Sequence, residues 1–404
     1  MKTKIQLFAA FLLLAVGALW LTSCSSEDAV QGSGSQADAS LTLTINTGKV
    51  GSRATAWDGT TTPTSTDENT INRLTVGIFD ASTKKVKTIV ELTTSATTGG
   101  NSLSVSGNTA TATIVTTSLA TGDDVLVAAN APAGNFAGVA DETGFNAKTE
   151  GIEIAVLSSS DYTKEINTNI PMYGASTLNG SGSTFTATVS VQHQLAKITL
   201  DNLSVDFAQD GPYKSAKFTP TEFFVVNVPT SLAFSTAAID ATATHLHGFG
   251  TAYGISAASE WGAYKEYLAT GTLSGSALFG IASSGTEKYG SKSFFYVTPS
   301  TDVTSNGKMK LIIAGKFDAD GTGAAEETVF YPVAINATYD AAGNATAADG
   351  GTLFQVSPNK NYKCTVVIKT KGTTDPTKNL DPQTATVNVT VTDFVEASQT
   401  TTFE

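Results

Sequence analysis

The sequence predicts an all-β protein made of antiparallel β-sandwiches. The composition favours Thr, Ser, Val, Ala and Gly, and both Thr and Val are residues that strands prefer. Short runs of alternating apolar and polar residues, separated by turn-forming clusters, extend along most of the chain. A length of 404 residues suits two domains of ordinary size, each with its own core.

The N-terminus has the pattern of an export signal. Lys2 and Lys4 precede an apolar run over residues 7–21, which is too short for a typical membrane-spanning helix. The run leads into the sequence LTSC, which resembles the lipobox of bacterial lipoproteins. We therefore expect residues 1–23 to be a signal peptide and the thiol of Cys24 to carry a diacylglyceryl group. The alternative is an ordinary signal peptide that happens to contain a cysteine.

Two segments of different character follow the signal. Residues 25–39 are rich in Ser, Gly and acidic residues and have no apolar periodicity, which is typical of a tether. In residues 40–50, Leu41, Leu43 and Ile45 alternate with polar residues. That alternation predicts a half-buried first strand.

Arg53 stands just after this strand and is one of only two arginines in the chain. Residues 51–69 carry Gly, Ser, Thr, Pro and Asp, which predicts an exposed loop, and exposed loops are where proteases cut. The other arginine, Arg73, opens a predicted strand, and a strand paired in a sheet resists cleavage. On residue type alone Arg53 would be an ordinary loop arginine, and only its surroundings suggest processing.

Further strands are predicted in both halves of the chain. They lie at 73–81, 87–93, 103–107, 111–117, 124–132 and 184–192, and then at 292–299, 308–318, 328–335, 361–369 and 384–395. We expect an N-terminal sandwich over 54–188 and a C-terminal sandwich over 189–383. Between about 236 and 293, Trp261, Tyr264 and Leu268 stand at helical spacing, which predicts a short helix in a loop of the second domain.

No constellation predicts catalysis, a metal site or a cofactor. His245 and His247 could share a metal on one side of a strand, but without a further ligand nearby two surface histidines are the simpler interpretation. Residues 318–327 begin like a calcium loop and then depart from it, so they predict a turn. Cys364 falls on the apolar face of a strand and should be buried and inert, and His193 should be a half-buried, satisfied side chain. A net charge of −12 without basic clusters argues against nucleic acid as a partner.

The chain ends with a strand-like segment, residues 384–404, whose alternation is close to that of the first strand. Its apolar residues are Val387, Val389, Val391 and Phe394. If a cut between Arg53 and Ala54 let the first strand leave, an apolar groove would open along a sheet edge, and another chain could fill it. Head-to-tail insertion of this kind does not close on itself, so it would build a filament.

Several motifs, taken in order, make the sequence resemble the fimbrillins that form type V pili. They are the lipobox at Cys24, GSRAT around Arg53, NRLTVGIFD, DVLVAANAP, IPMYG, HQLAKITL, SPNKNYKCTVVIK and the terminal VTDFVEASQTTTF. One departure is Phe394, which stands where many fimbrillins carry a Trp.

The resemblance implies two transthyretin-like β-sandwich domains and export as a lipoprotein of the outer membrane. It also implies trimming at the Arg53–Ala54 bond by an arginine-specific protease of the gingipain kind, so that residues 24–53 are lost. The donor strand would be residues 384–404, inserted into an identical or related pilus subunit. No enzyme activity and no cofactor are implied, and the mature protein would belong to an extracellular fimbrium.

Within this interpretation a shaft subunit fits best, because an anchor subunit should keep its first strand and a tip subunit need not end in a donor strand. The alternative is a monomeric surface lipoprotein that binds glycans on Trp261, Tyr264 and Tyr267. It leaves Arg53 and the terminal strand unexplained. A hydrolase comes a distant third, because no acid, base or nucleophile can be named.

Overall fold

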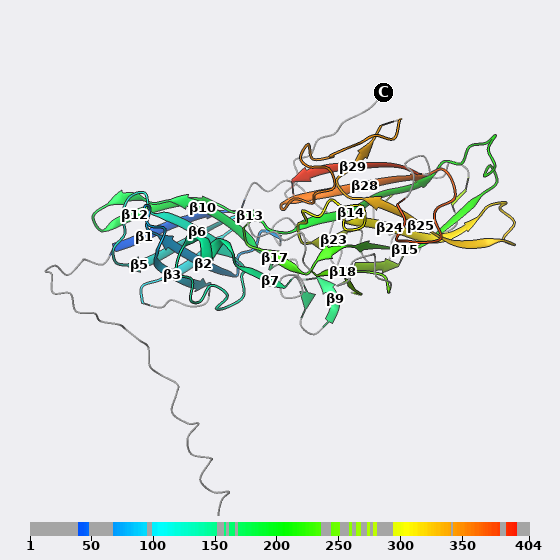
Figure 1. Ribbon diagram of the computed structural model, residues 1–404. Helices are drawn as coiled ribbons and strands as arrows, with labels where there is room; N and C mark the ends of the chain where they lie inside the picture. Colours follow the sequence, from blue (N-terminus) through cyan, green and yellow to red (C-terminus); the bar gives the residue numbers. More distant parts are fainter. Residues whose placement is uncertain are drawn as a thin grey trace, which may run out of the picture. The chain divides into compact units, whose positions relative to one another are not determined.

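Strands dominate the computed structural model, as the sequence predicts (Figure 1). The structure describes residues 39–47, 68–94, 99–151, 157–158, 161–165, 169–235, 244–250, 258–260, 264–267, 273–274, 278–280, 294–340, 342–379 and 385–393. In this part of the chain no helix is long and apolar enough to span a bilayer.

Two five-stranded sheets enclose the first core. One has the order β11-β12-β1-β5-β4, with β11 (Asn179–Ser181), β12 (Thr184–Ser190), β1 (Ala39–Asn46), β5 (Thr109–Thr116) and β4 (Ser102–Ser106). The other has the order β13-β10-β6-β2-β3, with β13 (Gln192–His193), β10 (Met172–Thr177), β6 (Asp124–Ala129), β2 (Arg73–Phe79) and β3 (Val86–Thr93). Alternate residues of both sheets are buried in one apolar cluster, so the pair forms a sandwich.

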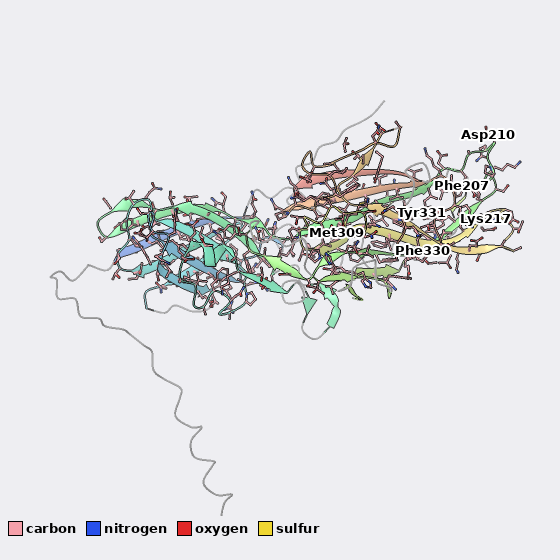
Figure 2. The ribbon with its side chains drawn as sticks, viewed as in Figure 1. Phe207, Asp210, Lys217, Met309, Phe330 and Tyr331 are labelled. Carbon is pink, nitrogen blue, oxygen red and sulfur yellow. The ribbon has the colours of Figure 1, made fainter. Side chains whose placement is uncertain are left out.

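A second pair of sheets encloses a separate core. The first consists of β14 (Ala196–Val205), β22 (Leu278–Gly280), β23 (Phe294–Val297), β28 (Lys360–Ile368) and β29 (Ala385–Asp393). The second consists of β15 (Lys217–Val226), β20 (Lys265–Tyr267), β21 (Leu273–Ser274), β24 (Lys310–Asp318) and β25 (Glu326–Ala334). Figure 2 marks Phe330 and Tyr331, consecutive residues of β25. Tyr331 packs edge-on against Phe218 inside the sandwich, whereas Phe330 belongs to a smaller cluster with Phe224.

Short elements complete the described structure. They are α2 (Glu142–Asn146), the pairs β7 (Thr149–Gly151) with β17 (Ser231–Ala233), β8 (Leu157–Ser158) with β9 (Asp161–Glu165), and β26 (Thr338–Tyr339) with β27 (Ala345–Thr346), and the sheet of β16 (Val228–Pro229), β18 (His245–His247) and β19 (Ala258–Glu260). The side chain of Asp141 caps α2 by accepting a hydrogen bond from the Gly144 amide at 2.9 Å.

The helix predicted around Trp261 is wrong for the described part of that stretch. β19 and β20 occupy it, and β20 pairs with β15. Tyr264 is 3 % exposed and packs edge-on against Phe295 at 6.1 Å between ring centroids. Backbone pairing with β15 and burial of this ring therefore outweigh the helical spacing of the aromatic residues.

The prediction of surface histidines is also wrong. His245 and His247 lie on β18 and are 2 % and 3 % exposed, because that strand is paired with β16 on one side and β19 on the other. The turn predicted at 318–327 is confirmed. It joins β24 to β25, and the Asp318 carboxylate accepts hydrogen bonds from the amides of Gly321 and Gly323, both of which have positive φ.

Candidate functional site: the first strand and the terminal strand

The first strand, β1, lies in the middle of its sheet. It pairs antiparallel with β5 along one side and parallel with β12 along the other. Leu41, Leu43 and Ile45 are fully buried, as their alternation predicts, and Thr42 between them is exposed. If β1 were absent, the backbone groups of two neighbouring strands would lose their partners over its whole length.

The side chains that flank β1 change in size along the strand. Leu41 lies between Ile114 and Phe185 in the register of the sheet. Leu43, by contrast, lies between Ala112 and Ala187. Because both neighbours are small, the side chain of β1 itself must fill the space between them. This position therefore requires a large apolar residue.

β1 is fixed where it ends. The Thr47 amide donates to the Asn108 carbonyl at 3.1 Å, and the Val191 amide donates to the Asn46 carbonyl at 2.9 Å. The structure describes the chain again from Glu68. Arg53 and Ala54 fall in the segment between, outside the described residues, and so does Cys24.

The terminal strand, β29, has a different position in its sheet. Among the described strands it pairs with β28 alone, antiparallel, with Val387 opposite Val366 and Val391 opposite Tyr362. Val389 is 2 % exposed and belongs to the second core. Phe394 lies outside the described residues. Within the described structure, β29 is therefore an edge strand that is paired with β28 alone.

The candidates for chemistry are structural residues. Cys364 is fully buried, as predicted, and burial raises the pKa of its thiol to about 12, which leaves it protonated and inert. His193 is more deeply buried than expected, and burial lowers its pKa. No group of three or more His, Cys, Asp or Glu side chains in the described ranges could hold a metal ion. Burial of Tyr264 also removes one of the three aromatic residues of the glycan-binding alternative.

One polar cluster escapes prediction. Lys197 stands on the polar side of the pattern LAKITL, yet its side chain is 1 % exposed and its ammonium lies 2.5 Å from the carboxylate of Glu68. The partners are far apart in the sequence, and each alone looks like an ordinary surface residue. No local signal could have revealed their burial.

Comparisons with known proteins agree with this architecture. The family model of the major fimbrial subunit protein FimA matches residues 39–200. No curated protein matches the chain.

Solved structures share the fold over most of the chain. A fimbrilin (FimA) from Porphyromonas gingivalis W83 is 18 % identical, with a TM-score of 0.57, over 89 % of this chain and 99 % of that one. A candidate cell adhesion protein from Bacteroides eggerthii is 20 % identical, with a TM-score of 0.58, over 89 % and 96 %. One from Parabacteroides distasonis is 14 % identical, with a TM-score of 0.60, over 90 % and 100 %. Residues 39–200 therefore match the FimA family model, and the solved structures show the same β-sandwich fold.

Proposed function

We propose that this chain is a shaft subunit of an adhesive fimbria, polymerised by donor-strand exchange. It is exported as a lipoprotein with lipid on Cys24 and is anchored in the outer membrane as a precursor. An arginine-specific protease then cuts between Arg53 and Ala54, and β1 gives way to the terminal strand of another subunit. The same interpretation assigns 1–23 to the signal peptide, 24–53 to the part removed, 54–188 and 189–383 to the two sandwiches, and 384–404 to the donor.

The observation that carries the proposal is the difference between the places of the two strands. β1 has hydrogen-bonded neighbours on both sides, whereas β29 has one among the described strands. A terminal strand that leaves β28 and enters the place of β1 exchanges one ladder of backbone hydrogen bonds for two. Between subunits this exchange favours the polymer.

Burial determines how β1 leaves. Leu41, Leu43 and Ile45 are fully buried, and at about 1.5–3 kcal/mol each their burial contributes about 5–9 kcal/mol. That is comparable to the stability of a whole domain. After a cut behind Arg53, β1 is therefore expected to stay bound in its sheet. The incoming strand then displaces it.

Limited digestion tests the proposal. The chain 25–404 is treated with an arginine-specific protease and examined by mass spectrometry and on an unboiled denaturing gel. We expect a product that begins at Ala54 and a ladder of polymers. Arg53→Gln should abolish both, whereas Arg73→Gln should change neither.

Deletion of residues 384–404 separates cutting from assembly. The shortened chain should be cut after Arg53 as fast as the full chain and remain a monomer. A full-length chain that is cut cleanly and remains a monomer would contradict the shaft assignment. So would a ladder that survives the deletion.

A further inference from the structure

The first residue described after the predicted processing site is fixed by a buried ion pair. The side chains of Glu68 and Lys197 are 5 % and 1 % exposed, and 2.5 Å separates the Glu68 Oε1 and Lys197 Nζ atoms. The Tyr296 hydroxyl donates to the same carboxylate. The Lys197 ammonium also lies 4.7 Å from the ring centroid of Phe294. The carboxylate of Glu68 is thus held by β14 and β23 of the second pair of sheets.

The backbone that follows is also held in place. His193 donates from Nε2 to the Glu68 carbonyl at 2.9 Å. The Asn130 side chain donates to the Thr70 carbonyl at 2.8 Å and accepts from the Asn72 amide at 2.9 Å. Residues 68–72 are therefore anchored at both ends, and this segment directly precedes β2.

Asn69 disfavours the closed conformation of residues 68–72. Its side chain is 2 % exposed, and neither its amide oxygen nor its amide nitrogen has a hydrogen-bond partner in the described structure. Burying an unpaired amide costs free energy, which favours opening of residues 68–72. The ion pair of Glu68 offsets this cost.

We propose that Glu68, held by Lys197, confines processing to Arg53 by protecting Arg73. The proposal rests on the proposed function, because it concerns the same protease. Arg73 is the first residue of β2, and its side chain is 32 % exposed, so a protease could reach the guanidinium. Its backbone is not available, because Arg73 pairs with Thr93 and its carbonyl accepts from the Asn130 amide at 2.9 Å. Cleavage there requires local opening, and its rate follows the population of the open state.

Glu68 controls this opening because it lies between the new N-terminus and Arg73 in the sequence. Once the chain is cut after Arg53, the new end is Ala54, and opening that starts from this end meets Glu68 before it reaches Arg73. The ion pair of Arg73 with Glu91, at 3.5 Å, is about one-third exposed on both sides and contributes little. Removing one partner of the buried pair deprives the other buried charge of this ion pair and is strongly destabilising.

Three variants of the chain 25–404 test the proposal: Glu68→Gln, Lys197→Met and the double variant. Each is digested with an arginine-specific protease, and mass spectrometry follows the products that begin at Ala54 and at Leu74. In each single variant we expect the Leu74 product to appear at least about tenfold faster than in the wild type, with the Ala54 product unchanged. The double variant removes both charges of the pair and should regain part of the protection.

Glu91→Gln is the matched control. It removes the surface partner of Arg73 and should change the rate of the Leu74 product less than about twofold. Circular dichroism and an unchanged rate of cutting after Arg53 confirm that each variant is folded. Folded single variants that release the Leu74 product no faster than the wild type would overturn the proposal, and so would a larger effect of Glu91→Gln.

The outcomes also separate this inference from the proposed function. A wild-type chain that resists cutting after Arg53 contradicts the processing step, yet the comparison at Arg73 still decides the role of Glu68. Conversely, cutting confined to Arg53 in every variant supports processing and overturns the role of Glu68.

Discussion

At the scale of single residues, Glu150 on β7 is an unusual carboxyl group. It is 9 % exposed, and neither of its oxygens has a hydrogen-bond partner in the described structure. Burial raises its pKa from 4.5 to about 8. The folded chain therefore keeps this proton up to a pH near 8, whereas the unfolded chain releases it near pH 4.5. Over that window the unfolded state binds fewer protons, so the contribution of Glu150 to stability falls as pH rises.

Glu150→Gln should remove this pH dependence. We expect the variant to be more stable than the wild type by about 4 kcal/mol at pH 7.5 and by less than about 1 kcal/mol at pH 4.5. Urea unfolding at the two pH values measures the difference. A variant whose advantage is the same at both would show that Glu150 does not retain its proton in the folded chain.

Leu43→Ala should be the most damaging single truncation in β1. Its register neighbours, Ala112 and Ala187, are too small to fill the space, so a cavity remains and the cost is about 2–5 kcal/mol. Thr42→Ala on the exposed face is the control and should cost less than about 1 kcal/mol. Denaturant unfolding of the uncut chain compares them, and equal costs would contradict the assigned packing.

Residue-scale prediction from the sequence succeeds where one strand pattern decides burial. Alternation identified Leu43 and Cys364 as core residues, and both are fully buried. The prediction failed for His245. This residue is buried because its short strand, β18, pairs with β16, and the composition of the segment does not reveal that pairing. Alternation could not find Lys197, because the partner that makes its burial tolerable stands at residue 68.

At the scale of elements, the place of β1 should accept a free strand. A synthetic peptide of residues 39–47, in excess over cut subunits, should compete for that place and shorten the ladder of polymers. A peptide of the same composition with the apolar residues moved by one position puts them on the wrong face and should not compete. Unboiled gels measure ladder length, and equal inhibition by both peptides would contradict a specific place in the sheet.

The positions of strands in the sequence were easier to predict than the order of the strands in each sheet. The pattern at 40–50 predicted β1, and the pattern at 361–369 predicted β28. The strand order is a different matter, because β1 pairs in parallel with β12, whose residues lie far along the chain. Nothing within β1 specifies which strands flank it, since partner choice depends on packing against the second sheet.

At the scale of the whole molecule, the proposed strand exchange gives each chain one place to be filled and one strand to donate. Such a contact is heterologous, so it produces an unbranched filament. This proposal rests on the two ends of the sequence and on the order of its motifs. The fold alone could not have supplied the processing step, because the Arg53–Ala54 bond lies outside the described residues.

Disulfide trapping shows whether the terminal strand of one subunit occupies the position of β1 in the next. Thr44 of β1 faces Thr111 of β5 in register, so a cysteine at Thr111 would report on whatever strand replaces β1. One subunit carries Thr111→Cys, or Thr109→Cys or Thr113→Cys to allow for register, and a second carries Thr390→Cys. Cys364 is fully buried and does not compete.

We predict disulfide-linked dimers at one of these positions after cutting at Arg53, and none with Arg53→Gln subunits. Polymers that form without a cross-link at any of the three positions would contradict strand exchange at β1, and so would equal cross-linking of cut and uncut chains.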